Sequence, residues 1–323
     1  MGSSGINIGD YSHNVNLARL ASPSNPINGI TTNTVQNASA RVPYLGFTPI
    51  GLQQNAFNAV YNYNSLQATF RKQFSRGFGF QSAYTWSKNL TNVGFNSSNL
   101  NDPNDMDQQY GQAPYSRPQR FVVGFQYELP FKGEGIVGKV ARGWMASGNV
   151  LVQSGNPLTL FDARGGTIYY GGAPSNGSDK GASRAQLCPG KTYADIATSG
   201  SVKDRLGRAG DLSVKRFFDP TAFCAPAAIG NGTAFGDSGV GILRGPGQAN
   251  TDFSITKTTP IGEGQSVQFR SEFFNLFNHP QFALPVLPGN FNQSLFPSSA
   301  NFGLITATSV SPRIIQFAVR VQF

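Results

Sequence analysis

The sequence contains little charge, two cysteines, two histidines and no long apolar run. Charged residues make up only 13% of its 323 residues. No stretch of about 18 apolar residues occurs, which excludes a transmembrane helix. Neither His13 nor His279 lies in a context that supports acyl transfer or zinc binding. We therefore expect no enzymatic activity, no metal and no cofactor.

Three short motifs that resemble catalytic or ligand-binding loops are each incomplete. Residues Gly133–Lys139 have the spacing of a phosphate loop, but the hydroxyl residue that should follow the lysine and bind Mg²⁺ is absent. Residues Gly236–Gly239 (GDSG) resemble a protease nucleophile segment without a matching histidine. The carboxylates of Asp102, Asp105 and Asp107 lack the glycine turn and distal glutamate of a calcium loop. We interpret the first motif as a turn and the aspartates as part of a solvated loop.

The basic character of the chain does not point to nucleic acid. The formal net charge is +9, yet no run of Lys and Arg is longer than the pair Arg71 and Lys72. No recognition helix and no RNA-binding signature accompanies these residues. Scattered basic side chains that line the lumen of a pore explain the charge better.

Alternation of apolar and polar residues is clearest at the carboxyl terminus, in residues 312–323 (PRIIQFAVRVQF). The apolar side of this predicted strand consists of Ile315, Phe317, Val319, Val321 and Phe323. A terminal aromatic residue is typical of the last strand of a bacterial outer-membrane barrel, so we interpret this side as lipid-facing. A soluble β-sandwich, in which a second protein layer covers the same side, is the alternative.

The same alternation predicts seven strands in all, over residues 63–71, 78–86, 121–129, 144–153, 252–258, 266–277 and 315–323. Short turns are expected at Ser75–Gly77 and Pro260–Gly264, and a connection through Gly133, Gly135 and Gly138 joins the third strand to the fourth. Short and long connections alternate, as in membrane barrels with compact periplasmic turns and large external loops.

We therefore predict an all-β fold, an antiparallel transmembrane β-barrel portion of about seven or eight strands of a larger barrel with long external loops. This portion covers residues 56–323, whereas residues 1–55 are mostly irregular with a possible strand across Val42 to Leu52. Hydrocarbon does not tolerate unpaired strand edges. The chain alone is expected to form an incomplete curved sheet or to close into a smaller barrel of about eight strands.

The amino terminus and the cysteines both bear on the cellular compartment. The first residues, MGSSGINIGDYSHNVN, contain no secretory signal. An outer-membrane protein needs such a signal, so the chain is expected to be a fragment of a longer protein. Cys188 and Cys224 lie in one polar, glycine-rich region. A disulfide facing an oxidising exterior and two unpaired thiols are both compatible with their positions.

Several segments match one known family in order and spacing. They are Tyr63–Lys88, Arg120–Val122, Tyr127–Phe131, Gly143–Trp144, Gln153–Pro157, Phe218–Pro220 with Ala222–Phe223, Gly241–Gly247, Gln268–Pro280, and Pro312–Arg313 with Gln316–Phe317. Through these segments, residues 60–323 resemble the C-terminal part of the barrel of Oar-like TonB-dependent receptors of the acidobacterial type.

The resemblance implies one third of a 22-stranded outer-membrane barrel that takes up a bulky, scarce ligand. In such receptors the external loops and an internal plug bind the ligand, and TonB pulls on the plug. The implied partners are outer-membrane lipid, the barrel-assembly machinery, and the plug domain and TonB system through an upstream part absent from this sequence. A structural or adhesive outer-membrane barrel without active transport is the alternative.

Polar residues on the lumen side are expected to contact the plug or to line the ligand path. The candidates are Arg71, Gln126, Glu128, Arg270 and Glu272, with Gln67 and Gln268 on the same side. Arg270 and Glu272 are two residues apart on one strand face, so mutual salt bridging explains them equally well. Phe317, Val319, Val321 and Phe323 are expected to form the C-terminal assembly signal.

Overall fold

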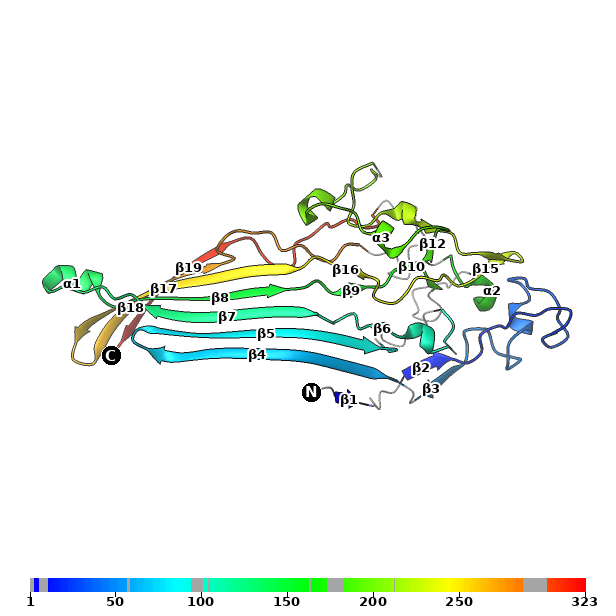
Figure 1. Ribbon diagram of the computed structural model, residues 1–323, viewed down its shortest axis with the longest axis horizontal. Helices are drawn as coiled ribbons and strands as arrows, with labels where there is room; N and C mark the ends of the chain where they lie inside the picture. Colours follow the sequence, from blue (N-terminus) through cyan, green and yellow to red (C-terminus); the bar gives the residue numbers. More distant parts are fainter. Residues whose placement is uncertain are drawn as a thin grey trace.

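The computed structural model describes residues 3–5, 11–56, 59–93, 101–103, 105–162, 164–172, 183–211, 213–286 and 301–323. One antiparallel sheet dominates this part of the chain (Figure 1). Its long strands, in spatial order, are β4 (Tyr61–Ser75), β5 (Phe78–Thr91), β7 (Gln119–Glu128), β8 (Trp144–Gln153), β17 (Gln248–Gly262), β18 (Gln265–Phe274) and β19 (Ile314–Gln322). All seven predicted strands are therefore confirmed. Of the helices within the described ranges, none has the length and apolarity to cross a membrane.

The register of the strand pairs divides the side chains of the sheet into two continuous faces. Directly opposite residues share a face, and successive residues alternate between faces. One row of paired residues runs through Phe78, Tyr127, Ala146, Ile255, Ser271 and Phe317. The neighbouring row, on the other side, runs through Gly79, Gln126, Ser147, Ser254, Glu272 and Gln316. We call these sides the apolar face and the polar face.

Among the residues that the structure describes, no second protein layer covers the apolar face. Phe121, Phe269 and Phe317 expose 39%, 38% and 66% of their surface, although all three are large apolar side chains. Both buried apolar clusters consist instead of residues outside the long strands. A β-sandwich would bury these rings between its two layers. The soluble alternative is therefore wrong.

The two ends of the sheet differ in the length of their connections. Two-residue turns at Arg76–Gly77 and Glu263–Gly264, the segment containing α1 (Gly135–Ala141), and the carboxyl terminus gather at one end (Figure 1). Residues 92–118, 154–247 and 275–313 connect the strands at the other end. The predicted asymmetry is confirmed, and it fixes which end of the sheet carries the long loops.

The long connections and residues 11–56 contain short elements that pack together, and we call their described residues the loop cap. The helical elements are η1 (Ala38–Ala40), η2 (Asp107–Gln109), α2 (Thr167–Tyr170), α3 (Tyr193–Ile196), η3 (Val202–Arg205) and η4 (Pro220–Ala222). The strand pairs are β2 (Tyr11–Asn14) with β3 (Gln53–Ala56), β9 (Pro157–Leu158) with β16 (Leu243–Arg244), β10 (Phe161–Asp162) with β11 (Ser183–Arg184), β12 (Gln186–Leu187) with β13 (Phe223–Cys224), and β14 (Ala228–Ile229) with β15 (Gly232–Thr233).

Among the strands that the structure describes, the sheet stays open. β1 (Ser3–Gly5) pairs with β4 at one edge, β6 (Gly111–Gln112) pairs with the end of β5, and β19 forms the opposite edge. Of the two predicted outcomes, the chain adopts the incomplete curved sheet. The possible strand across Val42 to Leu52 is not formed, because that stretch consists of turns and bends that place Val42 in a small buried cluster of the loop cap.

Several predicted boundaries differ from the observed ones, among them the ends of β17 and β18 and the connection that contains α1. β18 ends at Phe274 and not at 277, because Asn275 has a left-handed φ of 52°. β17 continues to Gly262, so the turn expected at Pro260–Gly264 narrows to Glu263–Gly264. The connection expected to be a glycine turn contains helix α1, which begins at Gly135 with φ of 61°.

Candidate functional site

The five predicted lumen-facing residues all lie on the polar face. The register links Gln126 of β7 to Glu272 of β18 through one serine on each of the two strands between them. Glu128 is two residues from Gln126, and Arg270 is two residues from Glu272, so alternation puts them on the same face. Arg71 of β4 joins this face through its pairing with Gln81. Pairing between strands thus brings together residues that are up to about two hundred positions apart.

The sheet is hollowed along the polar face. A cavity of about 460 Å³ is lined by Arg71, Gln126, Arg270 and Glu272, together with Gln81, Asn149, Asp252 and other residues of β4, β5, β7, β8, β17 and β18. We call it the first hollow. Glu128 is not among its lining residues. Four of the five predicted residues therefore share one concave surface, and this surface is long, polar and open.

Arg270 and Glu272 form an ion pair across one face of β18, with 2.6 Å between Nη2 and Oε1. The predicted proximity of these two side chains is thus observed. Both remain partly exposed, and pairs of this kind contribute at most about 1 kcal/mol because solvent screens them. The pair therefore adds little to the stability of the sheet.

A comparison with protein families agrees with this division into two faces. Residues 1–316 match the family model described as "Outer membrane beta barrel domain". The chain belongs to this family. No curated protein and no solved structure matches the chain. The protein is therefore located in the outer membrane. Strands of barrels in that membrane have an apolar side toward lipid and a polar side toward the interior, and the two faces of this sheet have that division.

A second hollow lies on the polar face of this barrel portion, where the strands meet the loop cap. It measures about 290 Å³ and is lined by Tyr63, Gln67, Thr85, Ser87, Asn89, Tyr115, Ser116, Arg117 and Arg120. The described residues of its wall thus include two arginines and no carboxylate. Arg117 Nη1 donates to the Ser154 carbonyl at 2.9 Å. The pKa of Arg117 is lowered, first by burial and then by the nearby positive charge of Arg120.

Buried side chains hold the loop cap together across large distances in sequence. The guanidinium of Arg41 is fully buried and donates to the carbonyls of Arg19, Thr34 and Ile168. Burial lowers the pKa of this guanidinium. The guanidinium, which has several donors, thus satisfies three carbonyls that lie outside regular strands. An apolar cluster that includes Leu160, Phe218 and Phe302 joins the 154–247 connection to residues after 300.

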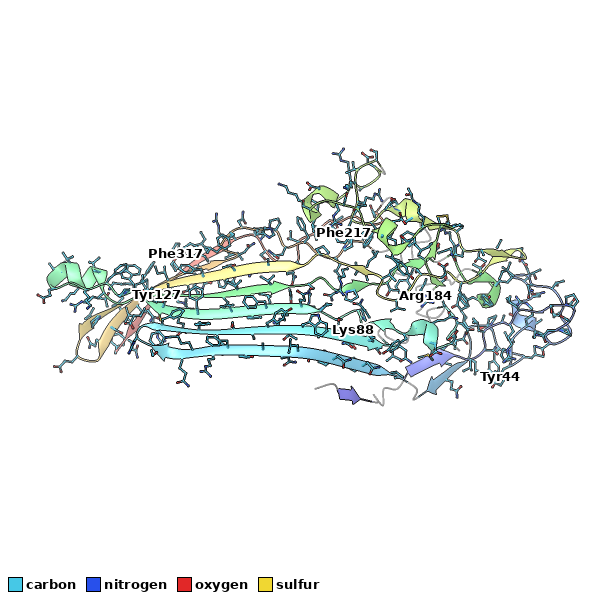
Figure 2. All side chains as sticks on the ribbon, viewed as in Figure 1. Tyr44, Lys88, Tyr127, Arg184, Phe217 and Phe317 are labelled. Atoms are coloured by element: carbon cyan, nitrogen blue, oxygen red, sulfur yellow. A yellow bond between two sulfur atoms is a disulfide. The ribbon has the colours of Figure 1, made fainter. Side chains whose placement is uncertain are left out.

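Cys188, which directly follows β12, forms a disulfide with Cys224, the last residue of β13. Of the two possibilities that the sequence leaves open, the structure has the disulfide, and it encloses the loop segment of α3 and η3. Figure 2 shows Arg184 and Tyr44 in the part of the loop cap that lies away from Tyr127 and Phe317, and Phe217 nearer the middle of the molecule. The described part of the loop cap is thus cross-linked by a disulfide.

The residues of the GDSG segment and of the aspartate cluster are part of the loop cap. Ser238 of the GDSG segment is fully buried, and the carboxylate of Asp237 accepts the backbone N–H of Leu187. In the aspartate cluster, Asp105 accepts hydrogen bonds from Gln108, from both its backbone and its side chain. The carboxylates of Asp237 and Asp105 thus stabilise loops of the loop cap through hydrogen bonds.

The residues of the second hollow were not predicted as a site. Tyr63 follows the alternation that puts Gln67 on the polar face, so the sequence contained a signal for it. Arg117 and Arg120 also stand close together without a nearby acidic residue. Tyr115 and Ser116 belong to a loop, where no periodicity indicates direction, and only the fold of residues 113–118 against the sheet places them there.

Proposed function

We propose that this chain is the C-terminal barrel portion of an Oar-like TonB-dependent receptor that takes up a bulky, scarce ligand and has no catalytic activity. The observation that carries the proposal is the open sheet with a hollowed polar face. Seven long strands that do not close suit a large barrel, and the largest barrels enclose a plug. In this proposal Arg71, Gln126, Arg270 and Glu272 face the plug or the ligand path.

The loop cap supports the same proposal, because large ligands first meet the outer loops of such receptors. Its buried clusters and its disulfide give it a defined shape, and an ordered surface loses less entropy when it binds a ligand. The C-terminal residues Phe317, Val319, Val321 and Phe323 lie on the edge strand or at its end. We propose that the barrel-assembly machinery recognises this edge.

The decisive experiment asks whether TonB binds the protein that the full gene encodes. Chemical crosslinking to the periplasmic domain of TonB should capture that protein, whereas the 323-residue chain alone should not be captured. Cells that carry the full gene should deplete a compound from the medium only when TonB is present. A full-length protein that increases cell adhesion equally with and without TonB, and that TonB does not capture, would establish the adhesive alternative.

A further inference from the structure

The second hollow has the chemistry of an anion site. Two guanidinium groups, Arg117 and Arg120, line it, and neither belongs to an ion pair among the described residues. Tyr63, Gln67 and Thr85 add neutral hydrogen-bonding groups to the wall. An unpaired cationic pair with neutral donors around it favours a carboxylate or phosphate, because guanidinium groups bind these planar or tetrahedral anions with two hydrogen bonds each.

A second observation points to a ligand at the same place. Ser116 Oγ and Asn89 Oδ1 are buried and make no hydrogen bond in the part of the chain that the structure describes, and both residues line the hollow. A buried polar atom without a partner costs about 1–3 kcal/mol. A bound molecule with hydroxyl or amide groups would satisfy both atoms once these two side chains turn toward the hollow. The exposed ring of Tyr115 also offers an apolar surface beside the arginines.

We propose that the second hollow binds an anionic, hydrogen-bonding group of the transported ligand, a carboxylate or a phosphate, through Arg117 and Arg120. The proposal names the ligand class of the receptor function above and rests on it. A volume of about 290 Å³ lies at the lower end of small-molecule sites, so the hollow holds one part of a bulky ligand and not the whole.

The test uses the protein as its full gene encodes it, in detergent, with inorganic pyrophosphate as the probe in calorimetric titration. Arg117→Gln and Arg120→Gln should each weaken binding at least tenfold. The matched control Arg208→Gln, a surface arginine of the loop cap, should change it less than twofold. Equal weakening by all three variants, or no binding to the unaltered protein, would overturn the proposal. Capture by TonB in the same preparation distinguishes the proposed ligand class from the proposed receptor function. Capture without pyrophosphate binding would overturn the ligand class and leave the receptor function standing.

An independent observation concerns helix α1, at the end of the sheet with the short turns. Ile136, Val137 and Val140 expose 83%, 76% and 64% of their surface. Residues three and four positions apart are neighbours on a helix surface, so Val140 lies beside both Ile136 and Val137 and the three side chains form a single apolar strip. Such a strip facing water would be unfavourable, at about 25 cal/mol for each Å² of apolar surface.

Two residues of the apolar face hold the carboxyl end of this helix. Lys257 Nζ donates to the carbonyls of Lys139, at 2.7 Å, and Arg142. The indole Nε1 of Trp144 donates to the Val140 carbonyl at 2.9 Å. Lys257 and Trp144 pair across β17 and β8 in register with Phe269 and Val319. The helix is therefore attached to the side of the sheet that contacts lipid.

We infer that α1 lies in the periplasmic leaflet of the outer membrane, with Ile136, Val137 and Val140 among the acyl chains. Lys132, Lys139 and Arg142 outnumber the single acid Glu134 in this segment. Cationic side chains beside an apolar strip suit the phosphate groups of phospholipids. The apolar face of the sheet thus continues beyond the strands into this short helix.

Fluorescent labelling of single cysteines tests this placement. Cys188 and Cys224 are joined in a disulfide, so Val137→Cys and the control Glu263→Cys, in the turn between β17 and β18, can be labelled with bimane. In vesicles of phosphatidylethanolamine and phosphatidylglycerol, nitroxide lipids should quench the label at 137 at least threefold more than at 263, and iodide should show the reverse order. The same comparison with Val140→Cys guards against misfolding of one variant. Equal iodide quenching at 137, 140 and 263 would overturn the inference.

Discussion

Phe269 and Phe317 lie side by side on β18 and β19, with ring centroids 6.1 Å apart and ring planes 18° from parallel. Between these strands the register places the rings on the apolar face, while Glu272 and Gln316 pair on the opposite side. Offset aromatic pairs add about 0.5–1.5 kcal/mol to the burial of their area. Adjacent residues of β19 thus lie in two different environments, lipid on the apolar face and water with polar groups on the polar face.

The substitution Phe317→Arg should destabilise the inserted barrel strongly, whereas Gln316→Arg should not. An arginine on the lipid face costs about 2–4 kcal/mol near the bilayer midplane, but on the polar face water and polar groups surround it. Urea unfolding of both variants in phospholipid vesicles measures the difference. Equal loss of stability in the two variants would contradict the assignment of the faces.

The ion pair between Arg270 and Glu272 should contribute little to stability. We expect a coupling free energy below about 1 kcal/mol, because both side chains are partly exposed and solvent screens their charges. A double-mutant cycle with Arg270→Gln and Glu272→Gln measures this energy. A value above about 2 kcal/mol would mean that the pair is a structural element of the sheet and not mainly a feature of the first hollow.

Removal of the disulfide should loosen the loop cap and leave the sheet intact. The bond closes a loop of 36 residues, for which the chain-entropy model gives about 4 kcal/mol. In the variant Cys188→Ser with Cys224→Ser, trypsin should cleave within residues 188–224 at least tenfold faster. The heat-dependent shift in gel mobility, which reports the folded barrel, should be unchanged. Unaltered cleavage would show that the apolar cluster of the cap suffices.

The turn between β4 and β5 requires glycine at position 77. Arg76 and Gly77 have φ of 54° and 78°, as in the two-residue turn that suits twisted hairpins. A Cβ at position 77 would also lie 3.2 Å from the Glu128 carbonyl oxygen. Gly77→Ala should therefore cost about 1–2 kcal/mol, while Arg76→Gly should be neutral or stabilising. Refolding yields and urea midpoints measure both, and the opposite order would contradict the turn assignment.

The predicted strands were recognisable because each contains a local pattern. In β7, Phe121, Val123 and Phe125 alternate with Val122, Gly124 and Gln126, and the lipid that contacts one face requires that alternation. The residues at which the strands begin and end were harder to predict from the sequence. β4 and β5 continue to Tyr61 and Thr91, where polar residues occupy both faces and the alternation disappears.

The loop cap and the second hollow have no comparable pattern. The Val35 N–H donates a hydrogen bond to the side chain of Asn231, 196 residues away. The Arg41 side chain donates to the Ile168 carbonyl, 127 residues away. Such contacts depend on where several irregular segments meet, and no local rule of spacing describes that meeting.

The order of residues was sufficient to divide the strands into lipid-facing and interior sides and to place the tight turns, because those features depend on neighbours a few positions away. Only the tertiary structure determined the open edges, the two hollows and the attachment of α1 to Lys257 and Trp144. Each of these features needs atoms from strands that long connections separate in the sequence.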